Sequence, residues 1–246
     1  MTSLKSLWDI FTDRYSFFPI HPQYYTKKYT RTGIDLSIKY ARGTLLDIGC
    51  GRMPYKERLL KGAEKYIGLD QPNTAKFYKG KEKPDIFADA TAIPLKSNSC
   101  NTVIALQVLE HLPEPLKALQ EAYRVMSPRG MLILSTIQSY PTHDEPYDYY
   151  RYTRFGLEYL VKQARFKVKN TISEGNIFIL IEQSFNVYLM LKLKQLSLSP
   201  LGKILAILLL PFILVLTLVL NLLSLPFQYI DRRSNFRIVQ TLVASK

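Results

Sequence analysis

The sequence predicts an α/β fold built on a doubly wound sheet whose strands are mostly parallel. Three observations support this prediction. Short apolar runs of strand length alternate with helix-like stretches between residues 31 and 172, as expected for strands joined by helical crossovers. The first run ends in a glycine-rich turn, which is typical of a strand that passes into a helix in such sheets. A long apolar segment then interrupts the rhythm before a final strand-like run.

Each expected element follows from this alternation. The strands are predicted at residues 44–48, 65–70, 85–89, 102–106 and 131–135, from 166 onward, and at 236–243. Helices are expected over about 31–41, after Pro113-Glu114-Pro115, and over 153–165, where apolar residues recur at helical spacing. Residues 127–130, with the sequence Ser-Pro-Arg-Gly, are expected to form a turn before the fifth strand.

The composition describes a chain that can bury a core and that carries a large positive charge. Of 246 residues, 47% are hydrophobic and 22% are charged, which excludes a disordered protein. The formal net charge of +13 favours an anionic partner, either a nucleic acid, an anionic membrane or a phosphorylated substrate, unless it is only a basic soluble surface. Cys50 and Cys100 lack metal-ligand spacing, so the sequence predicts no metal site and a reducing compartment.

The residues after the first two strands indicate a nucleoside cofactor. An Asp-x-Gly-x-Gly turn covers residues 47–51, and the second strand ends at Asp70, nineteen positions past Gly51. Small residues let the backbone approach a bulky ligand, and an acid at the next strand end can accept the ribose hydroxyls. The turn alone is a weak signal, but Asp89-Ala90 after the third strand strengthens it. Pro54 breaks the third-glycine pattern that a dinucleotide needs.

Five motifs together resemble those of class I S-adenosylmethionine-dependent methyltransferases, of the type 11 kind. They are Leu46-Asp47-Ile48-Gly49-Cys50-Gly51, Gly68-Leu69-Asp70, Ala88-Asp89-Ala90, Val108-Leu109-Glu110-His111-Leu112 and Ser127-Pro128-Arg129-Gly130. The resemblance covers roughly residues 43–172. It implies a Rossmann-like methyltransferase sheet with an antiparallel last strand, and S-adenosyl-L-methionine as the cofactor.

The resemblance also assigns roles to the residues that match these motifs. Gly49, Cys50 and Gly51 would form the turn under the methionine part of the cofactor, and Asp47 would orient its amino group. The remaining cofactor contacts would come from the ends of three strands: Asp70 at the ribose, Asp89 and Ala90 at the adenine, and Gln107 near the methyl group. The chain departs from the family at Met53, where a third glycine is common.

The loop after the fifth strand is the expected acceptor site. Residues 142–153 contain a histidine, acids, four tyrosines and an arginine, and they resemble the same loop in methyltransferases of bacterial cell-envelope and polysaccharide pathways. His143 is the first candidate for a general base, or else a loop histidine bonded to a neighbouring acid. Tyr147 is predicted to contact the acceptor or to pack in a lid. His111, which follows Glu110, is predicted either to act in catalysis or to order the loop.

The chain is expected to have four parts: an aromatic arm or lid (1–30), the cofactor-binding core (31–175), a hydrophobic helical insertion (176–230) and the last strand (231–246). Residues 204–220 have Thr217 as their only polar side chain. This apolar segment is long enough to suggest a membrane-spanning helix. Because the flanking strands should pair, the insertion must lie in the interface, re-enter at Pro211, or form a hairpin with residues 177–196. The alternative is a helix buried in a dimer.

The predicted function is methyl transfer to a small-molecule, glycan or lipid-linked acceptor at the cytoplasmic side of the cell membrane. Basic residues on both sides of the insertion favour an anionic membrane surface. The alternatives are a quinone-type methyltransferase that acts on a lipid-soluble ring and a non-catalytic membrane-anchored scaffold. The sequence does not favour a nucleic-acid partner, because it contains no dense basic stripe. The sequence makes no prediction about oligomers.

Overall fold

The computed structural model describes residues 18–77, 83–231 and 235–246, and the chain divides into two compact units. The sheet unit comprises residues 30–138, 142–173 and 239–246. The hairpin unit comprises the residues up to Tyr29 together with residues 139–141 and 174–238. The first seventeen residues of the predicted arm lie outside the described residues.

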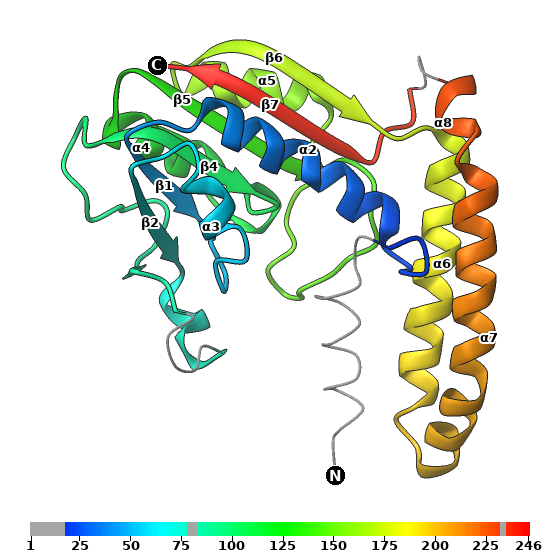
Figure 1. The fold of residues 1–246 in the computed structure, drawn as a ribbon. Helices are drawn as coiled ribbons and strands as arrows, with labels where there is room; N and C mark the ends of the chain where they lie inside the picture. The colour runs from blue at the N-terminus through cyan, green and yellow to red at the C-terminus, as the bar shows by residue number, and fades with distance from the viewer. Residues whose placement is uncertain (1–17, 78–82, 232–234) are drawn as a thin grey trace. The chain divides into compact units, whose positions relative to one another are not determined.

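Seven strands in the described residues form one sheet, in the order β3-β2-β1-β4-β5-β7-β6 (Figure 1). They are β1 Thr44–Ile48, β2 Lys65–Asp70, β3 Ile86–Phe87, β4 Cys100–Leu106, β5 Met126–Ile137, β6 Lys167–Glu174 and β7 Val239–Ser245. Strands β1 to β5 pair in parallel, whereas β7 runs antiparallel to β5. This confirms the predicted α/β sheet, its antiparallel last strand and the helical insertion before that strand.

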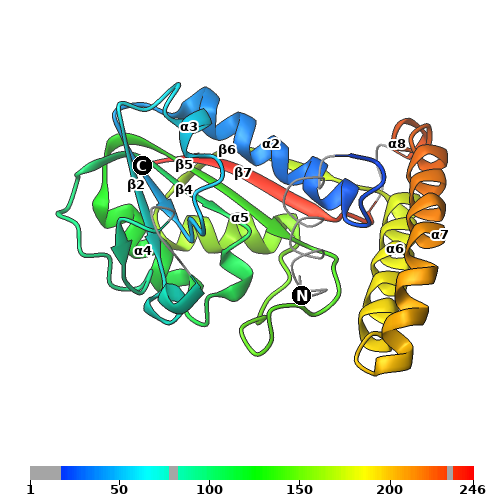
Figure 2. The same ribbon diagram turned by 60° about the horizontal axis from the view of Figure 1, so that its bottom comes forward.

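Helices cover both faces of the sheet (Figure 2). They are needed there because successive side chains of a strand point to opposite faces, and the buried strands are apolar on both. Leu45 and Ile133 point to one face, where they pack with α2 (Tyr24–Tyr40) and α3 (Lys56–Leu59). Leu46 and Leu132, each one position away, point to the other face. There they pack with α4 (Pro115–Val125) and α5 (Arg154–Gln163). The sheet is therefore buried on both sides, and ligands can reach it only at the ends of its strands.

Two predicted elements differ from the structure. Helix α2 begins at Tyr24 and not near residue 31, because Pro19 and Pro22 both precede it and nothing in the aromatic stretch that follows breaks a helix. Residues 127–130 are not a turn before the fifth strand but lie inside β5. Cys100 pairs with Met126, and Thr102 pairs with Met131, so these residues loop out as a bulge and the strand then rejoins its partner.

The hairpin unit contains two long helices, α6 (Ile177–Leu196) and α7 (Pro200–Ser224), followed by the short α8 (Phe227–Ile230). Helices α6 and α7 lie side by side in both ribbon views and pack through Met190, Leu193 and Ala206. Their connection is tight: Ser199 Oγ accepts a hydrogen bond from Gly202 N, and a Cβ on Gly202 would lie 1.9 Å from the carbonyl oxygen of Leu196.

The polar residues of these helices bind the segment before and at the start of α2, within the same unit. Thr26 N donates to Gln183 Oε1 at 3.2 Å, and Tyr25 Oη donates to the carbonyl oxygen of Asn221 at 3.0 Å. The Asn221 side chain donates in turn to the carbonyl oxygen of Pro19 at 2.6 Å. The interruptions of the apolar pattern at Gln183 and Asn221 therefore mark a buried polar seam.

Most apolar side chains elsewhere on the two long helices are exposed in this structure. Examples are Phe185 on α6 and Phe212 on α7, which are 45% and 74% exposed. Among the described residues, the stretch Pro200–Ile230 is long and apolar enough to cross a membrane. Its most apolar 18-residue window has a mean hydropathy of 2.8, and only 22% of that window is buried. Length and composition alone support this description.

Candidate cofactor site

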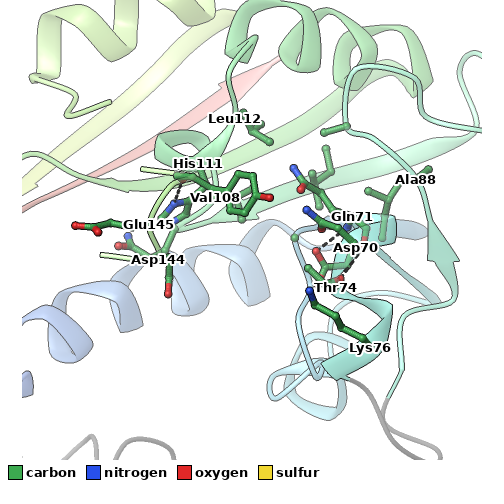
Figure 3. Close-up of a pocket in the computed structure, with 17 residues that line it drawn as sticks. Asp70, Gln71, Thr74, Lys76, Ala88, Val108, His111, Leu112, Asp144 and Glu145 are labelled. Carbon is green, nitrogen blue, oxygen red and sulfur yellow. Dashed lines mark hydrogen bonds between the residues drawn. The ribbon is translucent and has the colours of Figure 1, made fainter. Parts of the chain in front are cut away.

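A pocket of about 440 Å³ opens at the carboxyl ends of β1, β2 and β4, and all its lining residues belong to the sheet unit. The strand order reverses between β1 and β4, and open α/β sheets bind their ligands at such a point. The pocket has two walls (Figure 3). Asp70, Gln71 and Thr74 stand on one side of the cavity, and His111 and Asp144 on the other.

The turn after β1 brings backbone to the pocket. Gly49 lines the cavity with φ +70°, and its N–H and that of Cys50 both donate to the carbonyl oxygen of Leu69, at 2.8 and 3.1 Å. A Cβ on Gly49 would lie 2.4 Å from Val108 Cγ2, so only glycine fits. Gly51 also has positive φ, +54°, but a Cβ there would meet nothing within 4 Å. Cys50 and Gly51 are not among the residues that line the pocket.

Asp47 lies beneath this turn and not on the pocket wall. Its side chain is buried, and Tyr66 Oη donates a hydrogen bond of 2.5 Å to its carboxylate. Burial raises the pKa of Asp47 to about 7, although the Tyr66 hydrogen bond works in the opposite direction.

The second wall segment begins where β2 ends. Asp70 lines the pocket, and its Oδ1 accepts a hydrogen bond of 2.8 Å from Gln71 N. A 3-10 helix, Pro72–Phe77, then adds further polar side chains to the wall: Asn73, Thr74 and Lys76. The sequence prediction missed these residues, although a polar run directly after a strand-ending acid was a signal that could have found them.

The predicted adenine and methyl contacts are only partly on the wall. Ala90 lines the pocket, whereas Asp89 is exposed and accepts hydrogen bonds from Thr91 N at 2.8 Å and Thr91 Oγ1 at 2.7 Å. Gln107, at the exit of β4, lines the pocket with φ +58°, and its Nε2 donates to Ser135 Oγ at 2.9 Å. That hydrogen bond ties the Gln107 side chain to β5.

The loop wall holds the predicted catalytic residues. His111 and Tyr147 line the pocket, and the carbonyl oxygen of Tyr147 lies 2.7 Å from His111 Nδ1. His143 is not a lining residue, but its ring centroid lies 4.9 Å from that of His111. Its Nδ1 lies 3.2 Å from Asp148 Oδ2, which agrees with the alternative of a loop histidine bonded to a neighbouring acid. Asp148 is also bound by Arg151, at 2.5 and 2.7 Å.

Glu110 anchors this loop from below. Its side chain is fully buried, and one carboxyl oxygen accepts a hydrogen bond of 2.7 Å from Thr136 Oγ1. Its backbone carbonyl accepts from Tyr149 N and Tyr150 N, at 2.9 and 3.2 Å. Burial raises the pKa of the Glu110 carboxyl. The Glu110-His111 pair therefore orders the loop, and His111 in addition faces the cavity.

Comparison with known proteins matches a described domain that contains most of the residues lining this pocket, but not Asp144, Glu145 and Tyr147. Residues 46–134 match the family described as "Methyltransferase domain". The chain is 26% identical over 146 residues to a probable S-adenosylmethionine-dependent methyltransferase of Mycolicibacterium smegmatis, covering 56% of this chain and 57% of that protein. It is 26% identical over 138 residues to the ubiquinone biosynthesis O-methyltransferase of Pseudomonas fluorescens, covering 52% and 56%. The chain thus spans about half the length of the curated relatives it matches.

A solved structure shows the same fold. The S-adenosylmethionine-dependent methyltransferase from Archaeoglobus fulgidus superposes with a TM-score of 0.52 at 18% identity, covering 89% of this chain and 94% of that one. At this identity the likeness describes the fold alone.

Proposed function

We propose that this chain, whose residues 46–134 are a methyltransferase domain of the class I S-adenosylmethionine-dependent family, binds S-adenosylmethionine in the pocket and transfers its methyl group to an acceptor. The family predicted from the five sequence motifs is confirmed by this match, and S-adenosylmethionine is the cofactor of that family.

The pocket at the ends of β1, β2 and β4 is the observation that supports this function best. The Gly49 turn lets a large ligand approach the backbone, and Asp70 stands where it can accept hydrogen bonds from ribose hydroxyls. Ala90 offers an apolar contact for an adenine ring, and Gln107 marks the exit of β4. Asp47, beneath the turn, would be drawn toward its charged form by the cofactor's ammonium group.

In methyl transfer the protein mainly orients the acceptor and the methyl donor, and it need not form a covalent bond to either. The acceptor atom attacks the methyl carbon in line with the departing sulfur, and holding both in place can lower the barrier by ~7–11 kcal/mol. If the acceptor is a hydroxyl, a group must also remove or displace its proton. His111 and Tyr147 line the cavity, and the His143 ring contacts that of His111, so the proton-handling and acceptor contacts are proposed for this wall.

The acceptor is proposed to be a small molecule, a glycan or a lipid-linked compound handled at the cytoplasmic membrane surface. The exposed apolar side chains of α6 and α7 support a membrane location. Lys192, Lys194 and Lys203 flank the turn between these helices and are exposed. Carrying three lysines across a bilayer is costly, so a hairpin that lies along an anionic surface fits this distribution better than one that spans it.

A label-transfer experiment tests the proposed reaction. The purified full chain is incubated with S-adenosylmethionine carrying a tritiated methyl group and with separate lipid-soluble and water-soluble cell extracts. We expect label in the lipid-soluble extract, lost in Asp70→Ala and retained in Glu64→Gln, which removes an exposed carboxyl outside the pocket. A chain that binds the cofactor but labels neither extract would contradict the proposal and favour the scaffold alternative.

A quinone-type acceptor is the second candidate, because several of the relatives are named ubiquinone biosynthesis O-methyltransferases. It shares the pocket and the apolar hairpin with the first candidate, so only the product separates them. A labelled lipid-soluble compound that survives glycan-cleaving acid and absorbs as a quinone ring would favour this acceptor, and label lost with a released sugar would favour a lipid-linked glycan.

A further inference from the structure

Three side chains at the loop wall form a group that cofactor binding does not use. His111, His143 and Asp144 each offer one ligand atom, and these atoms all lie within 4.8 Å of one another. No second group of three or more histidine, cysteine or acidic residues is so placed within the described part of the chain. His111 follows β4, whereas the other two belong to the loop after β5, so the parallel pairing of these strands brings the group together.

Both histidine rings are held by oxygen atoms on their Nδ1 side. The carbonyl oxygen of Tyr147 lies 2.7 Å from His111 Nδ1, and Asp148 Oδ2 lies 3.2 Å from His143 Nδ1. A carbonyl and a carboxylate only accept hydrogen bonds, so each Nδ1 donates, and Nε2 is the ring nitrogen that would bind an ion. Histidines that bind metals are commonly oriented by such a carbonyl or carboxylate.

The outer partners are themselves fixed. Arg151 donates to both oxygens of Asp148, and His143 N also donates to Asp148 Oδ2, at 2.9 Å.

We propose that His111, His143 and Asp144 bind a divalent first-row transition ion, best represented by Zn²⁺. Two imidazole nitrogens and one carboxylate oxygen suit this class of ion, and three protein ligands leave a fourth position open for water or substrate. Bonds of about 2.0–2.2 Å would draw the three ligand atoms closer than their present spacing, so the loop should close slightly around the ion. The sequence predicted no metal because the ligands are far apart along the chain.

The position of this site indicates what the ion would do, and this step rests on the proposed function. His111 and Asp144 both line the pocket, on the wall across from Asp70 (Figure 3). The ion would bind a hydroxyl or phenol acceptor and lower the pKa of its O–H, so that the proton leaves to water. An electron pair of the oxygen then forms the O–CH₃ bond while the C–S bond breaks, and the C–S pair returns to sulfur in S-adenosylhomocysteine. His143 would then be a ligand and not a general base.

Metal titration tests the site without the methyl donor. The metal-stripped full chain is titrated with Zn²⁺ by calorimetry, and Co²⁺ is added separately to follow its visible absorption. We expect one equivalent to bind. His111→Gln and Asp144→Asn should each weaken binding by at least ~100-fold, because even the loss of an outer partner costs about 10–100-fold. Asp35→Asn, which removes an exposed carboxylate on α2, should leave binding unchanged.

Thermal melts show whether each variant is folded, so that lost binding can be assigned to the site. Absence of ion binding to the folded chain, or binding that survives both substitutions, would overturn the proposal. Cofactor affinity is measured separately in the presence of EDTA. A chain that binds Zn²⁺ but not S-adenosylmethionine would support the ion site and contradict the methyl-transfer proposal. If EDTA abolishes label transfer and added Zn²⁺ restores it, the result would support the role of the ion.

Discussion

Gly49 sets how closely a ligand can approach the end of β1. Its positive φ suits glycine, but the stronger constraint is Val108, whose Cγ2 occupies the space that a Cβ would need. Gly51 has a similar φ with open space around it. The two glycines of the turn therefore look alike in sequence and differ in structure, and this difference offers a matched pair of substitutions.

We expect Gly49→Ala to lower both stability and cofactor affinity far more than Gly51→Ala. Both variants carry the ~1–2 kcal/mol cost of a left-handed alanine, but only Gly49→Ala also displaces Val108 from the pocket wall. Thermal melts and calorimetric titration with S-adenosylmethionine measure the two effects. Equal losses in the two variants would contradict this account of the turn.

Asp47 should make stability depend on pH. Because burial raises its pKa to about 7, the folded state favours the neutral acid, and stability that is present below pH 4 is lost as pH rises toward and through 7. Asp47→Asn cannot ionise and can keep the acceptor for Tyr66. Its melting temperature relative to the parent should therefore rise between pH 5 and pH 8 by several degrees, at roughly 2–4 °C per kcal/mol. A difference that stays constant across this range would contradict the raised pKa.

The sequence predicts which residues line the pocket where those residues stand at the end of a strand. Asp70 and Gln107 were expected at the exits of β2 and β4, and both line the pocket. The positions of Asn73 and Lys76 depend on a 3-10 helix that the spacing of apolar residues does not predict. Asp89 follows a predicted strand that is only two residues long in the structure, and its carboxylate bonds to Thr91 and does not line the cavity.

At the scale of elements, apolar runs flanked by glycine or an acid gave accurate strands. Strands β1 and β2 have the predicted bounds because their ends are marked by Gly43, the Gly49 turn and Asp70. The bulge in β5 was not predictable, because its Ser-Pro-Arg-Gly sequence is that of a turn and only the register with β4 shows that the strand continues. The polar residues in α6 could be seen as interruptions, but their bonds to the segment around Pro22 depend on tertiary packing.

The helix pair should bind anionic membranes through its exposed apolar surface and the lysines at its turn. We expect the purified chain to float with vesicles that contain phosphatidylglycerol, and less with neutral phosphatidylcholine vesicles. Replacing Lys192 and Lys203 together by glutamine should weaken binding to anionic vesicles by about 30-fold, at ~1 kcal/mol per charge. Replacing the exposed Lys61 and Lys162 of the sheet unit is the matched control. A chain that stays unbound with both kinds of vesicle would contradict the membrane proposal.

At the scale of the whole molecule, the chain joins a methyltransferase sheet to an apolar helix pair inserted before the last strand. The sheet unit contains the complete candidate pocket, so cofactor binding is proposed to depend on that unit's residues alone. The hairpin unit supplies the proposed membrane contact. This division predicts that substitutions in the pocket change the affinity for S-adenosylmethionine, and that substitutions at the turn between α6 and α7 change vesicle binding.

Calorimetric titration with S-adenosylmethionine tests the central claim most directly. We predict one equivalent bound by the parent chain and by Glu64→Gln. Asp70→Ala should bind roughly 10–150-fold more weakly, because it loses hydrogen bonds from the ribose to a charged group that are worth about 1.5–3 kcal/mol. No heat of binding from the folded parent, or unchanged affinity in Asp70→Ala, would contradict the assignment of this pocket.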